Sequence, residues 1–280
     1  MKTYLINGGA GFVGSHFTRL IENKYVSDRI VVADTCTENV ADLNSIIFEQ
    51  VNYLSTDEYD KLFSKYKFDI VVNFIPSVQD VHNMHNLLEC CKNYNITRFV
   101  QVSIEDVNDS QKRFITKSSC AQLALSYYGM YNVPIIIVKS SNNFGPNQNR
   151  DKFIPNTISN AIRQNFVLIT GDGKLNRDWI YVTDTCRAID VILNFGKCGN
   201  VYNVCNGQKI DDLIIVKTIL KFFKLPLSLI EYTKMQDYYE YHFDNTEVKN
   251  LGWQPKIDFF DGLTDTIKWY QNKFEGENND

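Results

Sequence analysis

Three glycines near the amino terminus have the spacing of a loop that cradles a pyrophosphate. Gly8, Gly11 and Gly14 follow a strand-like apolar run and open a predicted helix at 12–22. The first glycine permits a tight turn, the second lets the backbone approach a phosphate, and the third lets the helix pack closely on the sheet. The start of the helix offers amide groups and a positive dipole end to the anion. The predicted cofactor contacts in this loop are Gly8, Gly11, Phe12, Val13 and Gly14.

An acidic residue ends the next predicted strand. Asp34 stands twenty residues after Gly14. A carboxylate at this point can accept hydrogen bonds from both hydroxyls of an adenosine ribose, and it repels a 2′-phosphate. The pair of features therefore predicts NAD, not NADP, as the cofactor. A glycine turn without a ligand, in a doubly wound fold, is the alternative that these residues leave open.

Short apolar runs alternate with amphipathic stretches through the first half of the chain. The predicted strands cover 3–7, 30–33, 70–74, 99–102 and 134–138, and the predicted helices cover 12–22, 82–94 and 117–131. This alternation predicts an α/β fold with a parallel, doubly wound Rossmann sheet that is buried on both faces. The glycine loop and Asp34 then lie at its carboxyl edge, where such sheets bind ligands.

The alternation ends near Asn142, and loops rich in Asn, Gly and Asp follow with short strands and modest helices. We expect residues 1–142 to form a dinucleotide-binding domain and residues 143–280 to form a smaller C-terminal lobe that binds the substrate. Some later segments are expected to return to the sheet.

Composition excludes several classes of protein. The chain has 280 residues, 44% of them hydrophobic, and a net charge of −4, which argues against wholesale disorder. It has no basic excess with which to grip nucleic acid, and no apolar run near the roughly 20 residues of a membrane helix. A strand-like segment at the amino terminus leaves no room for a signal peptide. We expect a cytoplasmic protein that binds neither nucleic acid nor membrane.

Cysteine and histidine give no sign of a metal site. The seven cysteines are odd in number and form no CxxC pair, so neither a disulfide framework nor a zinc ribbon is indicated. His82 and His85 can share a helical face, but no third Cys or His motif lies near them. A structural role for both histidines is expected.

Longer segments resemble the extended short-chain dehydrogenases of the NAD-dependent epimerase/dehydratase family, and among them the dTDP- or UDP-glucose 4,6-dehydratases. The resemblance runs from residue 1 to about residue 272. The segments that carry it are NGGAGFVGSH (7–16), ADTCT (33–37), SSNNFGPNQ (140–148), KFIP (152–155), GDGK (171–174), RDWIYVTD (177–184), YNV (202–204) and LGWQP (251–255).

The resemblance implies a reaction and its catalytic groups. The family oxidises the sugar at carbon 4, removes water across carbons 5 and 6, and returns the hydride to carbon 6. Lys117 matches the lysine of the family's Tyr-x-x-x-Lys pair, which holds the nicotinamide ribose. Ser103, Glu105 and Asp106 match its acid segment. There the first acid protonates the departing 6-hydroxyl, and the second removes the proton at carbon 5.

The resemblance also implies that the C-terminal lobe binds a nucleoside-diphosphate sugar. Arg177 is suited to a bidentate, charge-assisted contact with a phosphate, and Lys152 adds a second cation. Asn142 and Asn143 follow a strand at the ligand edge of the sheet and offer amide donors and acceptors. The predicted substrate contacts are Asn142, Asn143, Lys152, Arg177 and Asn203.

Several positions depart from the family pattern. Arg113 stands where the family has its catalytic tyrosine, and an always-charged guanidinium is no general base. Ile104 replaces a threonine, and the lengths of the two acids are interchanged at Glu105 and Asp106. The segment between Ser103 and Lys117 is short, as is the segment after 73–77, and no phosphate-binding arginine occurs near 238–241.

These departures leave three functions open. The first is a nucleotide-sugar 4,6-dehydratase or an epimerase that acts through a 4-keto intermediate. The second is a non-catalytic relative that binds NAD or a sugar nucleotide as a partner or regulatory subunit, and the third is a nucleotide-sugar reductase. A homodimer is expected through the helix at 82–94 and the helix after Lys117.

Overall fold

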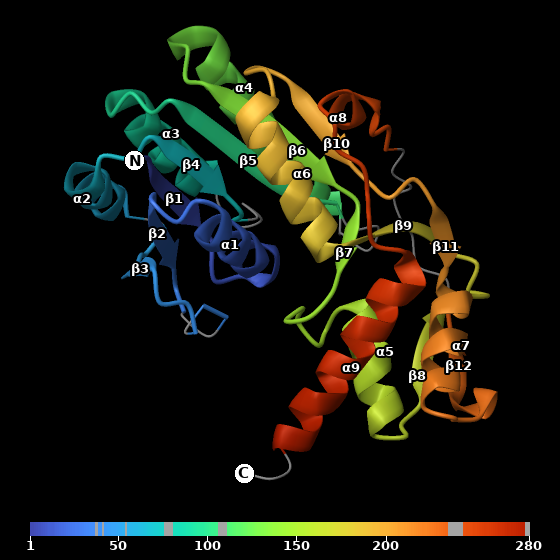
Figure 1. Cartoon of the computed structure of the whole chain (residues 1–280). Helices are drawn as coiled ribbons and strands as arrows, with labels where there is room; N and C mark the ends of the chain where they lie inside the picture. Colours follow the sequence, from blue (N-terminus) through green and yellow to red (C-terminus); the bar gives the residue numbers. More distant parts are fainter. Residues whose placement is uncertain are drawn as a thin grey trace.

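The computed structural model describes residues 1–36, 39–40, 42–53, 55–75, 81–105, 111–234 and 243–277, with the backbone alone for 111–115 and 277. A parallel seven-stranded sheet in the order β10-β6-β5-β4-β1-β2-β3 forms its centre (Figure 1). The strands are β1 (Thr3–Asn7), β2 (Arg29–Asp34), β3 (Ile46–Gln50), β4 (Ile70–Asn73), β5 (Arg98–Ile104), β6 (Ile135–Ser140) and β10 (Val201–Val204).

Helices cover both faces of this sheet (Figure 1). One face carries α1 (Phe12–Lys24) and α6 (Val182–Phe195). The opposite face carries α2 (Thr56–Tyr66), α3 (Val81–Asn93) and α4 (Gln111–Tyr131). The doubly wound α/β fold expected from the alternation of apolar strands and helices is therefore confirmed.

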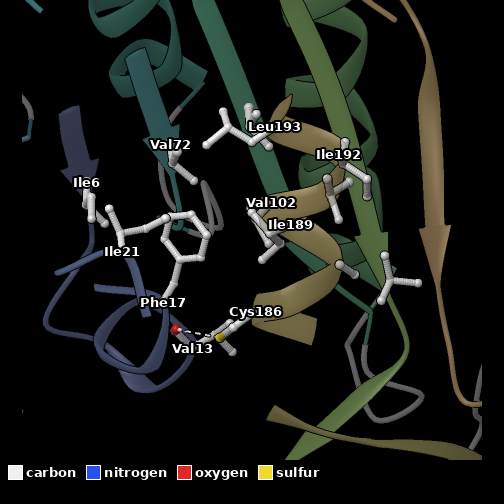
Figure 2. Close-up of a cluster of buried hydrophobic side chains, with 14 of the residues drawn as sticks. Ile6, Val13, Phe17, Ile21, Val72, Val102, Cys186, Ile189, Ile192 and Leu193 are labelled. Atoms are coloured by element: carbon white, nitrogen blue, oxygen red, sulfur yellow. Dashed lines mark hydrogen bonds between the residues drawn. The ribbon is translucent and has the colours of Figure 1, made fainter. Parts of the chain in front are cut away.

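Alternate residues of each strand supply the two apolar layers, because successive side chains of a strand point to opposite faces. Ile6 and Val72 pack against α1 and α6, and Figure 2 shows them with Phe17 of α1 and Ile189 of α6. Leu5 lies on the other face with the core residues of α2, α3 and α4. Burial of this kind contributes about 1.5–3 kcal/mol for each large apolar side chain.

A second group of elements follows the sheet in sequence and has its own apolar core. Its strands form one sheet in the order β11-β9-β7 and one in the order β12-β8. They are β7 (Asn142–Phe144), β8 (Val167–Thr170), β9 (Asn176–Tyr181), β11 (Lys209–Asp211) and β12 (Ile230–Thr233). The helices are α5 (Phe153–Ile162), α7 (Asp212–Phe222), η1 (Leu227–Leu229) and α9 (Phe259–Glu277). The short helix α8 (Thr246–Asn250) lies beside β10 instead, and its Val248 belongs to the core under α1 and α6. The strand β10 pairs with β6 and so belongs to the central sheet.

Two elements of the first half were not expected from the sequence, namely β3 and α2. The strand β3 lies at the edge of the sheet and is only partly buried, so its apolar pattern is weak. The helix α4 also begins earlier than expected, and Lys117 lies inside it instead of at its start.

The described ranges hold neither a membrane-spanning helix nor a cluster of metal ligands. None of the helices there has the length and apolar character needed to cross a membrane. No group of three or more His, Cys, Asp or Glu side chains is placed to hold a metal ion in that part of the chain.

The turn between β1 and α1 requires a glycine at position 14, because no space is left there for a side chain. A Cβ atom at Gly14 would lie 2.1 Å from the carbonyl oxygen of Gly8 and 2.9 Å from the Cα of Gly9. We expect Gly14→Ala to lower the free energy of unfolding by about 1–3 kcal/mol, because the backbone must shift to relieve the overlap. Urea titration followed by circular dichroism measures the change.

Gly129→Ala is the matched control. Gly129 is also helical, but a Cβ there would meet no atom within 4 Å. Alanine should add about 0.5–1 kcal/mol at this position. Equal stability of Gly14→Ala and the parent protein would contradict the close approach of α1 to its own turn.

Candidate active site

The glycine loop places the start of α1 beside the carboxyl end of β1. Gly8 adopts the left-handed φ of 76° that glycine tolerates, and its N–H donates to the Ala33 carbonyl at 2.8 Å. Gly11 is the extended residue before the helix. The first amide groups of α1, at Phe12, Val13 and Gly14, have no carbonyl within the helix to bind. The loop therefore forms a cradle suited to an anion.

Asp34 ends β2 next to this cradle, and its side chain is anchored on three sides. Its Oδ2 accepts from the Ala10 N–H at 2.8 Å. Its Oδ1 accepts from the Thr35 N–H at 2.7 Å and from the Tyr53 hydroxyl at 2.8 Å. An ionised carboxylate has about four acceptor positions. The Thr35 hydroxyl also donates to Oδ1, at the longer distance of 3.5 Å. Among the described residues only the Ala10 N–H binds Oδ2, so Oδ2 has one position for a ribose hydroxyl, where the sequence suggested room for two.

A second polar group gathers at the carboxyl end of β5. The Ser103 hydroxyl donates to Glu105 Oε1 at 2.9 Å, and the Lys117 amine donates to the carbonyl oxygen of Ile104. The Glu105 residue is only 4% exposed. The structure therefore brings together three of the four predicted catalytic residues. The fourth, Asp106, lies outside the described residues, as does the stretch 238–241.

The backbone of α4 places Arg113 one helical turn before Lys117. Further along α4, the Tyr127 hydroxyl contacts His85 Nδ1 at 2.8 Å and donates to Glu89 Oε1 at 2.6 Å, which ties α4 to α3. Burial and the bond to Glu89 raise the pKa of this phenol. Tyr127 is thus a structural phenol between two helices.

The two predicted asparagine contacts are nearly buried at the point where the chain passes from β6 to β7. The Asn143 amide donates to the Ser140 hydroxyl at 2.8 Å and to the Ser141 carbonyl at 2.9 Å. Its Oδ1 is buried and has no hydrogen-bond partner in the structure. Asn142 donates to the Asp178 carbonyl at 3.4 Å. The two amide nitrogens therefore hold the chain where it passes from β6 to β7, and the Oδ1 acceptor of Asn143 stays available.

The other predicted substrate residues come from separate elements. Lys152 is the N-terminal capping position of α5, and its carbonyl accepts from the Asn156 N–H at 2.8 Å. Asn203 lies in β10 opposite Lys139 of β6. Its neighbours Tyr202 and Val204 face the layer of α1 and α6, so Asn203 points to the opposite face.

Arg177 of β9 is buried, with 3% of its side chain exposed, and forms an ion pair with Asp212 at the start of α7. Its Nη2 lies 2.7 Å from Asp212 Oδ2. The guanidinium also lies 5.0 Å from the ring centroid of Phe153 and 5.6 Å from that of Trp179. Its Nε is buried and finds no hydrogen-bond partner among the described residues. The cation is thus oriented by a carboxylate and two rings.

Sequence reasoning missed Asp212, Phe153 and Trp179 as neighbours of Arg177. The only local signal is the acidic residue in the first turn of an apolar helix, a position that the helix dipole favours.

Known proteins resemble this chain in sequence and in fold. A model of the NAD dependent epimerase/dehydratase family matches residues 4–205. The chain belongs to this family. The resemblance found in the sequence is confirmed, and so is NAD, the cofactor on which the family depends.

Relatives extend the likeness over nearly the whole chain. The dTDP-D-glucose 4,6-dehydratase of Dictyostelium discoideum is 27% identical over 97% of this chain and 82% of its own length. A low-salt glycan biosynthesis protein of Haloferax volcanii is 31% identical over 95% of this chain and 97% of its own length. That alignment runs over 306 positions, against 280 residues here, so the relative has segments with no counterpart in this chain.

A solved structure agrees with the fold. The dTDP-glucose 4,6-dehydratase of Bacillus anthracis, in complex with NAD, has a TM-score of 0.90 and 28% identity, and the match covers 98% of both chains. The residues of this chain fit the same cofactor, because the first amide groups of α1 and the Asp34 carboxylate lie together at the glycine loop.

Removal of Arg177 should be costly, because it breaks a buried ion pair with Asp212. We expect Arg177→Ala to lower the free energy of unfolding by about 3–5 kcal/mol. Lys174→Ala, which breaks the exposed pair with Asp172, should leave the free energy of unfolding nearly unchanged. Chemical denaturation of both variants measures the difference.

A double variant separates stability from ligand binding. Arg177→Met with Asp212→Leu replaces the buried pair by apolar groups, which is often neutral for stability. This protein should fold like the parent and lose affinity for a nucleoside diphosphate in calorimetry. Unchanged affinity for the nucleoside diphosphate would show that Arg177 does not bind it.

Proposed function

We propose that the protein is a nucleotide-sugar 4,6-dehydratase that acts on a dTDP- or UDP-hexose with NAD. The observation that carries the proposal is the convergence of two groups at the carboxyl edge of one sheet. These groups are the dinucleotide cradle with Asp34, and the Ser103, Glu105 and Lys117 cluster. The names of the relatives, several of which are dTDP-glucose 4,6-dehydratases, support the same reaction.

Bound NAD supplies the acceptor and donor of a hydride. In the proposal, Lys117 orients the nicotinamide ribose through its amine. Glu105, held by the Ser103 hydroxyl and shielded from water, delivers a proton to the departing 6-hydroxyl. Asp106 removes the proton at carbon 5, and Arg177 binds a phosphate of the nucleotide. Residues 1–142 would hold the cofactor and residues 143–280 the sugar nucleotide, apart from α6, α8 and β10, which pack on or in the central sheet.

In our proposal the enzyme is slow, because another residue stands at the position of the family's tyrosine. Arg113 holds that position, and a guanidinium cannot take a proton from the 4-hydroxyl. The same replacement favours the second candidate, a relative that binds NAD or a sugar nucleotide as a regulatory partner. We also propose that the protein is cytoplasmic.

Incubation with dTDP-glucose, UDP-glucose and UDP-N-acetylglucosamine, followed by mass spectrometry, tests the function. We expect loss of water from one of the three at a rate below about 1 per second, the low end for enzymes. Arg113→Tyr should raise this rate, since it restores a phenol one turn before Lys117. Asp106→Asn should abolish dehydration.

Two results would decide against the slow dehydratase. Rapid dehydration by the unaltered protein would require a base from another position. Complete inactivity on all three substrates, with NAD still bound, would favour the binding protein. Lys117→Ala should weaken NAD binding under either function, so it serves as the control for an intact cofactor site.

We also propose a homodimer in which α3 and α4 pack against their copies. The two helices are held together by Tyr127, and apolar side chains lie exposed along them, among them Tyr131 at 50% and Met130 at 64%. Light scattering should give twice the 32.4 kDa of one chain. Tyr131→Asp should shift the mass toward the monomer, and a monomeric parent protein would contradict the proposal.

A further inference from the structure

Tyr53 contacts the cofactor site although it belongs to no part of the glycine motif. The strand β3 runs beside β2, with Gln50 opposite Asp34, and the Val51 N–H donates to the Asp34 carbonyl at 3.1 Å. The chain therefore leaves β3 at the same edge of the sheet where Asp34 ends β2. Three residues beyond β3, the Tyr53 hydroxyl returns to Asp34 and donates to Oδ1 at 2.8 Å.

The Tyr53 phenol is a permanent donor in this bond. Burial, and then the negative charge of Asp34, raise the pKa of Tyr53. The hydroxyl therefore keeps its proton over the working range of the protein. A hydrogen bond from a hydroxyl to a carboxylate is of the strong, charge-assisted kind.

The remaining contacts fix the orientation of the carboxylate. Oδ1 carries the bonds from Tyr53 and the Thr35 N–H, while Oδ2 carries the bond from the Ala10 N–H in the glycine loop. The Ala10 carbonyl is itself held by the Asn39 amide at 2.9 Å. Rotation of the Asp34 side chain would break bonds at both oxygens, so its charge stays directed at the space beside the loop.

We propose that Tyr53 is a positioning residue that sets the preference for NAD over NADP. By holding Oδ1, it keeps the Asp34 charge where the 2′-phosphate of NADP would lie and leaves Oδ2 to accept one hydroxyl of the adenosine ribose. Without the phenol, the carboxylate gains freedom to turn toward water. The ribose of NAD then loses an oriented acceptor, and the 2′-phosphate of NADP meets less repulsion.

Tyr53→Phe tests the proposal, with dissociation constants for NAD and NADP measured by calorimetry at one fixed salt concentration. We expect the constant for NAD to rise about tenfold, as for loss of a single hydrogen bond to a charged group. The constant for NADP should stay the same or fall. The ratio of the two constants should therefore drop about tenfold or more.

Tyr25→Phe is the matched control. The Tyr25 hydroxyl also donates to a nearly buried carboxylate at 2.8 Å, that of Asp190, but at the far end of α1 from the loop. This variant should leave both dissociation constants unchanged. In an Asp34→Asn background, Tyr53→Phe should no longer change the ratio, because no charge remains to be oriented.

Equal weakening of NAD and NADP would show that Tyr53 only supports local packing, and would overturn the proposal. Unchanged constants, or tighter binding of NAD, would overturn it as well, the latter because Tyr53 would then compete with the ribose. If Tyr53→Phe does not fold, the ratio of the dissociation constants for NAD and NADP is measured on Tyr53→Leu, which also lacks the donor. Binding needs no turnover, so this outcome is independent of the dehydratase test.

Discussion

Apolar burial on both faces of the central sheet is the constraint on which the rest of the molecule depends. Leu5 and Ile6, neighbours in β1, are both fully buried, one under α2, α3 and α4 and the other under α1 and α6. Polar groups that must meet a ligand are therefore confined to the strand ends and the loops beyond them. Asp34, the last residue of β2, and Glu105, just after β5, reach the same carboxyl edge for this reason.

Contacts between the two parts of the chain connect α1 with β7 and β9. The ring of His16 in α1 lies with Nε2 2.9 Å from the carbonyl oxygen of Pro146, just after β7. Burial lowers the pKa of this imidazole, so it is neutral and donates to that carbonyl. The strand β7 in turn pairs with β9, which carries Arg177. A short series of bonded elements thus links α1 with the strand that carries Arg177.

The sequence predicted the features that are local in the chain. The glycine spacing and the acid at the end of β2 define a motif within 34 residues, and each residue has one clear physical role. Pairs that form across the fold left no such pattern. Arg177 and Asp212 are 35 residues apart, and Tyr53 and Asp34 are 19 apart. Their meeting depends on strand order and loop direction, which periodicity alone does not determine.

The central claim is that this edge is organised for NAD by the chain's own residues, with the family's phenol absent. A crystal structure of the protein with NAD tests it most directly. The account predicts the pyrophosphate at the start of α1, one adenosine ribose hydroxyl on Asp34 Oδ2 with the Tyr53 bond intact, and the Lys117 amine on the nicotinamide ribose. A pyrophosphate away from the Gly8–Gly14 loop, or a Lys117 amine still bound to the Ile104 carbonyl, would contradict it.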